Sequence, residues 1–192
     1  MAHLFSKSGF MNGYQCPKRL YLYKNKYNLR DEISDAQQTV FSRGTEVGEL
    51  AQQLFPNGVN AKPNTPFEYE KSARDTQRYI KEGHTVIYEA AFIFEGVLAA
   101  VDILVKTNDE WIAYEVKSST SVKEPYITDT ALQYHVITKS GVPLKDIFVV
   151  YINNEYVRVG DLQIEKLFAM QSVLTDVIGM QNIITTKIIS SE

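Results

Sequence analysis

Hydrophobic residues dominate several short runs in the second half of the chain. One run covers residues 84–94, a second ends at Asp102, and a third ends at Lys117. Short runs that are rich in Val, Ile and aromatic residues indicate β-strands. The polar stretch Thr107–Glu110 predicts a turn that joins the second and third strands as a hairpin. Residues 145–151 form a further run and predict another strand of the same sheet.

Other segments repeat their hydrophobic residues at intervals of three and four, as amphipathic helices do. Ser34 is a candidate N-cap for one helix, Pro17 fits the first turn of an earlier one, and Gly83 is a helix stop. Tyr156–Val159 predicts a short return strand. The ranges predicted to be helical are 34–55, 67–82, 126–140 and 161–182, and residues 183–192 are predicted to be a helix or a tail.

These elements predict an α/β fold with a mixed central sheet, flanked by helices and preceded by a helical segment. We expect one domain, in which residues 1–83 are mainly helical, 84–152 form the core and 153–192 add a hairpin and a helix. The chain has 192 residues, of which 44% are hydrophobic and 22% charged. This composition is typical of a globular protein, and the length suffices for a substantial core.

Two carboxylates and a lysine stand at the ends of the predicted hairpin strands. Because side chains alternate along a strand, Glu115 and Lys117 should share one face, with Val116 on the other. Asp102 and Glu115 lie five residues before and after the predicted turn, so they should be nearly opposite each other. Hard oxygen ligands suit Mg²⁺ or Mn²⁺, which activate water and neutralise phosphate charge. The residues alone leave two readings open: a metal-dependent phosphodiester hydrolase, or two amphipathic strands with charged outer faces.

Several motifs occur in a characteristic order. They are Leu4–Ser8 with Cys16–Arg19, then Gly96–Asp102, then Glu115–Thr120, then Asp129–Gln133. Together they resemble the PD-(D/E)XK nuclease superfamily, and more narrowly the RecB-like nucleases and the CRISPR-associated exonucleases related to them. The resemblance covers most of residues 4–152. It implies a restriction-endonuclease-like core and a DNA nuclease, an exonuclease in DNA repair or a CRISPR-related role.

The resemblance also implies roles for individual residues. Asp102, Glu115 and the Val116 carbonyl would hold Mg²⁺ or Mn²⁺, and Lys117 would position or polarise the attacking water. Gln133 matches a Gln-x-x-x-Tyr pattern of the relatives, in which Ile137 replaces the Tyr here. We expect Gln133 to contact DNA or to order the site.

Two glutamates on the helix predicted at 34–55 are further candidates. The segment around Gly44 resembles a Gly-x-x-x-His motif, but Gly48 stands at the histidine position. Glu49 is therefore the candidate metal ligand, with Glu46 as an alternative, supporting residue. Glu89 in the first strand would support the metal site or pair with Lys117. Glu46 and Glu49 also fit the simpler reading of solvent-exposed helical glutamates, whereas a buried Glu89 would need a partner.

Cys16 occupies the place of an early cysteine that binds an iron–sulfur cluster in some relatives. The chain contains one cysteine, and such a cluster normally needs four ligands, so this chain alone cannot hold one. Either the branch it resembles has members without the cluster, or this is the nuclease part of a longer protein. A small, buried hydrophobic side chain is the simpler reading of Cys16.

Candidate nucleic-acid contacts lie in two segments. Lys18 and Arg19 belong to the most basic stretch of the chain, and Ser118 and Lys123 flank the loop after Lys117. Such residues can bind phosphates, but they also fit solvent-exposed faces. The formal net charge is −3 with a pI of about 5.7, so any basic groove would be local.

No apolar run approaches the roughly 18 residues of a membrane-spanning helix, and the first residues do not read as a signal peptide. We therefore expect a cytoplasmic protein. Three rival readings remain beside the nuclease. They are a catalytically weakened nuclease fold that binds nucleic acid, a hydrolase of small phosphoesters, and a purely structural domain.

Overall fold

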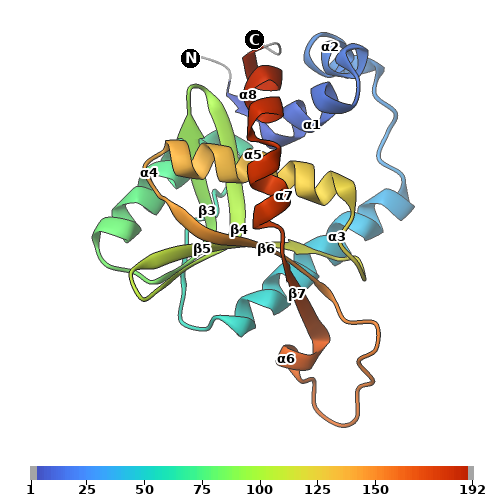
Figure 1. Ribbon diagram of the computed structural model, residues 1–192. Coiled ribbons are helices and arrows are strands. Elements are labelled where there is room, and N and C mark those ends of the chain that lie inside the picture. Colours follow the sequence, from blue (N-terminus) through green and yellow to red (C-terminus); the bar gives the residue numbers. More distant parts are fainter. Residues whose placement is uncertain (1–3, 190–192) are drawn as a thin grey trace.

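The computed structural model describes residues 4–189 and shows an α/β fold in which helices cover both faces of a mixed seven-stranded sheet (Figure 1). The strand order is β2-β3-β4-β5-β6-β7, and β1 pairs with β4 outside this path. The strands are β1 Phe5–Ser6, β2 Val59–Asn60, β3 Val86–Phe94, β4 Val97–Thr107, β5 Glu110–Lys117, β6 Leu144–Ile152 and β7 Phe168–Ser172. The fold class predicted from the sequence is confirmed.

The helices predicted at 34–55, 67–82 and 126–140 are present close to those ranges. Ser34 caps α3 as expected, because its hydroxyl accepts the Gln37 N–H while the Gln37 side chain accepts the Ser34 N–H. The helices are α1 Lys7–Gln15, α2 Pro17–Asn25, α3 Asp35–Ala51, α4 Tyr69–Lys81, α5 Glu124–Lys139, α6 Ile164–Leu167, α7 Leu174–Gly179 and α8 Gln181–Ile189. Short 3-10 turns occupy Tyr27–Leu29, Gln52–Leu54 and Pro66–Glu68.

The predicted hairpin is present as β4 and β5. Its two-residue loop consists of Asn108 and Asp109, both with positive φ, as tight hairpin turns between twisted strands require. The antiparallel register pairs Ile103 with Tyr114. The next residues along the strands are Asp102 and Glu115, so the turn and the register bring these two carboxylates to one place.

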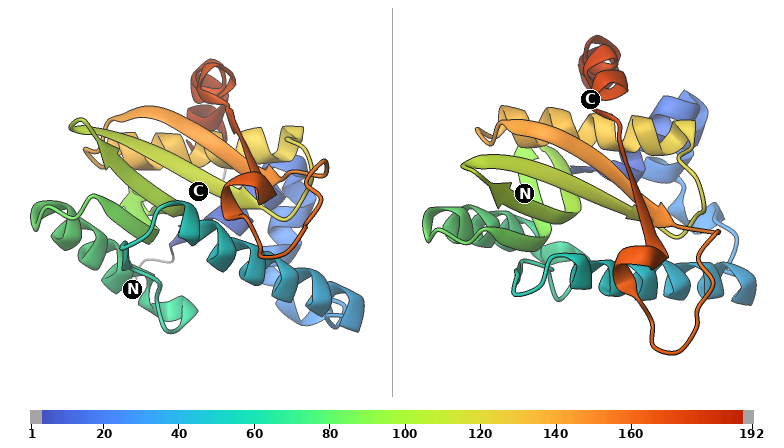
Figure 2. Two further views of the ribbon diagram at one scale, coloured as in Figure 1. Left: turned by 90° about the horizontal axis from the view of Figure 1, so that it is seen from below. Right: turned by 60° about the horizontal axis from the view of Figure 1, so that its bottom comes forward.

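The two faces of the sheet carry separate cores. Figure 2 shows α3 on one side of the sheet and α5, with α8 beyond it, on the other. On the α3 face Val47 packs with Tyr114, whereas on the α5 face Leu132 packs with Ala113. Because adjacent β5 residues serve opposite cores, Glu115 lies on the α5 face with Ala113, and Val116 belongs to the α3 face.

The alternation in β4 breaks at Asp102. Val101 and Ile103 would share one face of a regular strand, but they belong to the cores on opposite faces. The register places Asp102 opposite Glu89 of β3, and Glu89 has φ of +53°. A non-glycine residue in this left-handed region costs about 1–2 kcal/mol. The irregularity therefore lies where β3 and β4 carry two neighbouring acidic residues, Glu89 and Asp102.

The C-terminal part of the sequence prediction is wrong. Residues 161–182 do not form one helix, because β7 interrupts the range and pairs antiparallel with β6. Residues 156–159 are not a strand either, and β7 takes the role of the return strand. Pairing with an otherwise open sheet edge and burial of Phe168 override the local helical pattern. Of the range 183–192, residues up to 189 are helical, and the rest lie outside the described residues.

Candidate active site

Asp102 is tied to the neighbouring strand through the backbone. Its Oδ2 accepts the Val116 N–H at 2.6 Å, beyond the last regular pair of β4 and β5. Burial, and then the negative charge of Glu115, raise the pKa of Asp102 well above its usual value; the Lys7 ammonium and the Val116 N–H offset this only in part. A cation between the two carboxylates would relieve this repulsion.

Glu115 is almost completely buried, with its side chain 3% exposed. Its Oε1 accepts hydrogen bonds from two ammonium groups, Lys117 at 2.6 Å and Lys7 at 2.9 Å. Burial alone would raise the pKa of Glu115, but Lys117 and Lys7 outweigh it and hold this pKa far below its usual value. Glu115 is therefore an anion, and its Oε2 is buried with no hydrogen-bond partner among the described residues.

Asp129 completes a ring of alternating charges. Its Oδ2 accepts from Lys117 at 2.7 Å, and its Oδ1 lies 3.3 Å from the Lys7 ammonium. The ring thus runs from Glu115 through Lys117 and Asp129 to Lys7 and back to Glu115. Asp129 lies in the second turn of α5.

Neither lysine can serve as a base. Burial would lower the pKa of Lys117, but Glu115 and Asp129 dominate and raise it above its usual value. The same balance of burial against Asp129 and Glu115 raises the pKa of Lys7. Both groups therefore stay protonated at neutral pH and act as fixed positive charges and hydrogen-bond donors.

Sequence reasoning missed Lys7 and Asp129 as members of this site. Lys7 is 108 residues from Glu115 in the chain, and only the parallel pairing of β1 with β4 brings it there. Asp129 stood inside a noted motif without an assigned role. The charge of Lys7 at the first position of α1 was an available signal, because a cation is unfavourable at a helix N-terminus.

Gln133 lies one turn after Asp129 on α5 and is fully buried. Its amide nitrogen is 3.4 Å from Asp129 Oδ1, which makes it a member of the same network. Its Oε1 has no partner among the described residues. The structure thus places Gln133 next to the charged ring, and its role in ordering the site or contacting DNA stays a prediction.

A cleft of about 400 Å³ opens between α3 and the sheet, on the acidic side of this network. Glu49, Glu89, Asp102 and Lys62 line it together with apolar and glycine residues of α3. Burial raises the pKa of Glu89, although Lys62 opposes the shift. Glu46 and Glu49 are both exposed, but Glu49 lines this cleft and Glu46 does not, so the geometry favours Glu49 between the two predicted glutamates.

The donor set fits a divalent cation only in part. Among residues 4–189 no group of three or more His, Cys, Asp or Glu side chains is arranged to hold a metal ion. Two carboxylates are adjacent, however, and the buried Glu115 Oε2 lacks the partner that such an oxygen needs. Asp102, Glu115 and the Val116 carbonyl offer oxygen donors, and Mg²⁺ commonly completes its shell with water.

The predicted nucleic-acid contacts are all exposed and lie in two places. Ser118 and Lys123 border the loop between Lys117 and α5, next to the charged ring. Lys18 and Arg19 lie on α2, which follows the helix that carries Lys7. Ser118 and Lys123 are therefore closer in sequence to Lys117 than Lys18 and Arg19 are to Lys7.

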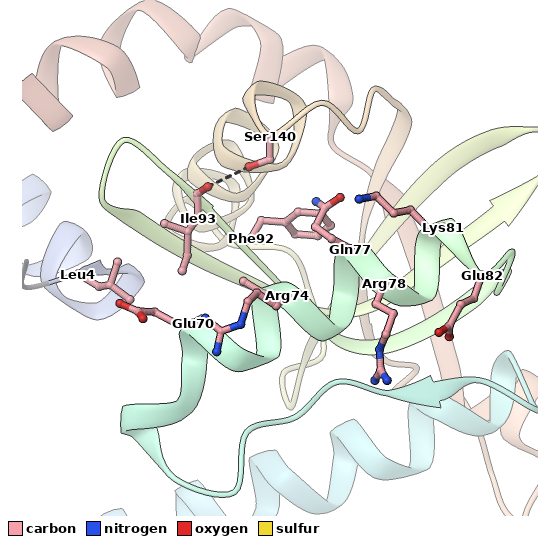
Figure 3. Close-up of a pocket in the computed structure, with 11 residues that line it drawn as sticks. Leu4, Glu70, Arg74, Gln77, Arg78, Lys81, Glu82, Phe92, Ile93 and Ser140 are labelled. Atoms are coloured by element: carbon pink, nitrogen blue, oxygen red, sulfur yellow. Dashed lines mark hydrogen bonds between the residues drawn. The ribbon is translucent and has the colours of Figure 1, made fainter. Parts of the chain in front are cut away.

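A larger hollow, of about 880 Å³, lies elsewhere, between α4 on one side and Phe92, Ile93 and Ser140 on the other. Figure 3 shows Arg74, Arg78 and Lys81 on this helix, with Phe92 behind them and Glu70 at one end. Arg78 already pairs with Asp75 at 3.0 Å. The hollow contains no buried charge and no orphaned polar atom among the described residues, in contrast to the ring around Glu115.

Within the described part of the chain, no helix is long and apolar enough to cross a membrane. No family model matches the sequence. No curated protein matches it either.

Solved structures are similar to this fold. An alkaline exonuclease from Laribacter hongkongensis superposes with a TM-score of 0.50 at 13% sequence identity, covering 99% of this chain and 88% of that one. A structure described as SSO0001 gives a TM-score of 0.38 at 12% identity over 94% of this chain and 78% of that one, too low to support an inference. The chain thus shares the fold of an exonuclease.

Proposed function

We propose that this protein is a metal-dependent deoxyribonuclease that removes nucleotides from DNA ends. The observation that carries the proposal is the buried, unpartnered Oε2 of Glu115 beside the Asp102 carboxylate, with Lys117 on the same strand face. Two adjacent carboxylates with a fixed ammonium suit the hydrolysis of a phosphodiester. The fold shared with an alkaline exonuclease supports a nuclease and is the reason for proposing action at DNA ends.

In this proposal Asp102, Glu115 and the Val116 carbonyl hold Mg²⁺ or Mn²⁺, and Glu49 contributes from the opposite wall of the cleft. When bound, the metal supplies an activated water and charge neutralisation at the phosphate. The Val116 N–H fixes one oxygen of Asp102 and so orients the other. Glu89 adds a further acidic group to the lining of the cleft, on the same side as Asp102.

Lys117 acts as a donor and a fixed charge. Because its ammonium stays protonated, it stabilises the negative charge that develops on the attacked phosphate and does not accept a proton. Glu115 and Asp129 hold the ammonium on two sides, so little reorganisation is needed during the reaction. Gln133 keeps Asp129 oriented through its amide group.

A second candidate function is a nuclease fold that binds nucleic acid without cleaving it. Two observations favour it: Gly48 stands where the resemblance expects a metal-binding histidine, and no three acidic or histidine side chains of the described residues form a metal cluster. This reading predicts DNA binding without metal-dependent products.

The test is cleavage of end-labelled single- and double-stranded DNA in Mg²⁺, Mn²⁺ or EDTA. Asp102→Asn should abolish metal-dependent products, whereas the matched control Asp109→Asn, on a side chain that is 94% exposed, should cleave like the wild type. Product ladders from each labelled end distinguish removal from ends from internal cleavage. Absence of products from folded wild-type protein with either metal would favour the binding module.

A further inference from the structure

The proposed mechanism gives no role to Lys7, although several contacts fix the position of this residue at the site. Ser6 caps α1 through the Gly9 N–H, and Phe5 N donates to Gly96 O at 2.8 Å. Lys7 therefore begins α1 at a fixed point, with its ammonium on Glu115 and Asp129. A lysine here opposes the helix dipole and removes charge from water, so local stability does not explain the choice.

Lys7 is also the member of the ring that a ligand can reach. Its side chain is 31% exposed, against 19% for Lys117, 10% for Asp129 and 3% for Glu115. An ammonium has three N–H donors. With the described residues Lys7 makes one hydrogen bond, to Glu115, and one longer ion pair, to Asp129, which leaves donor capacity for an incoming acceptor.

The charges of the cleft and of the adjoining ring explain why such a donor is useful. The acidic side chains are Glu49, Glu89, Asp102, Glu115 and Asp129, and the lysines are Lys7, Lys62 and Lys117, which makes five negative and three positive groups. One divalent cation would bring the fully ionised set to neutrality, from −2 to 0. Without Lys7 the same site would remain negative and would repel an anionic substrate.

We propose that Lys7 is a substrate-binding lysine of this site, whose ammonium donates to a non-bridging oxygen of the bound phosphodiester. The proposal rests on the proposed nuclease function for its substrate. Glu115 and Asp129 hold the ammonium ready in the free protein, and the phosphate oxygen takes the remaining donor position. Lys7 thereby balances the charge of an acidic metal site at the point where a phosphate enters.

Lys7→Met separates this role from a merely structural one because it should move two quantities differently. Loss of the cation leaves the carboxylates more negative, so Mn²⁺ binding to the DNA-free protein, measured by calorimetry, should be unchanged or tighter. DNA binding in Ca²⁺, measured by fluorescence anisotropy, should weaken about tenfold, and cleavage in Mn²⁺ should fall about 100-fold. Lys7→Arg should recover most of the DNA binding, since it keeps the charge.

Lys145→Met is the matched control, because Lys145 is an exposed lysine paired with a glutamate, Glu110, at the other end of the hairpin. It should change none of the three quantities. Joint loss of Mn²⁺ binding and DNA binding in Lys7→Met would assign Lys7 a structural role and overturn the proposal. Unchanged DNA binding would overturn it as well. If the wild-type protein binds DNA but does not cleave it, the proposed catalysis fails, while weaker binding by Lys7→Met still supports the role of Lys7.

Discussion

Two hollows of this molecule, the groove along α4 and the cleft beside α3, differ in a way that volume does not capture. The groove along α4 has about 880 Å³, twice the 400 Å³ of the cleft beside α3. Yet the charged residues of the groove, Arg74 and Lys81 among them, are exposed, whereas the cleft adjoins a ring of buried carboxylates and half-buried lysines. Buried charges are costly unless they are paired or bind a ligand. The candidate active site is therefore identified by the energetic cost of removing charges from water, and not by the volume of the hollow.

The largest loss of activity should come from neutralising a buried carboxylate of the ring. Glu115→Gln keeps the shape but removes the charge that Lys7 and Lys117 share and the proposed metal ligand. We expect cleavage of DNA to fall by about 10³-fold or more, because the metal loses a ligand and each of the two ammonium groups loses one of its two carboxylate partners. Single-turnover assays in Mn²⁺ would measure the loss, with circular dichroism to confirm folding. Retention of most activity would remove Glu115 from the site.

Removal of the lysine of the Glu-x-Lys motif should have the next largest effect. Lys117→Met deletes a fixed donor that Glu115 and Asp129 hold at 2.6 and 2.7 Å. We expect a decrease of about 10²–10³ in kcat with a smaller change in KM, since the donor acts mainly on charge that develops during the reaction. Steady-state kinetics on end-labelled DNA would show it. A change confined to KM would assign Lys117 to ground-state binding.

Gly48 offers a test of whether the metal binds beside α3. A Cβ at this position would meet no other atom within 4 Å, and the residue lines the cleft. Gly48→His should therefore be accommodated and should add a nitrogen donor opposite Asp102. We expect several-fold tighter Mn²⁺ binding by calorimetry, with Gly48→Ala as the control for the helix alone, which should gain about 1 kcal/mol in stability. Equal Mn²⁺ affinity in both variants would place the metal away from this wall.

The smallest effect should come from the groove along α4. Arg74 is exposed, and the double variant Arg74→Ala with Lys81→Ala removes two of the cations that line this hollow. Because substitutions at such surface positions usually change energies by about 0.5 kcal/mol or less, cleavage should change by no more than about twofold. A titration at several salt concentrations would detect a weak contribution to DNA binding. A tenfold loss would make the groove part of the substrate path.

Local patterns predicted the centre of the site well. Period-two alternation and the Thr107–Glu110 turn placed Asp102, Glu115 and Lys117 together, because a two-residue hairpin fixes register over short distances. Lys7 and Asp129 came from α1 and α5, and only tertiary packing brings those helices to the strand ends. The long helix expected over residues 161–182 failed for the same reason, since β6 offers Phe168–Ser172 a sheet edge that the local pattern does not reveal.

The most direct measurement is anomalous diffraction from crystals soaked in Mn²⁺. One strong peak is expected between Asp102 and Oε2 of Glu115, where the cleft beside α3 meets the charged ring, and it should be lost in Glu115→Gln. A peak at the acidic side chains of the α4 groove, Glu70 or Glu82, with none near Glu115, would contradict the assignment of the chemistry to the smaller cleft.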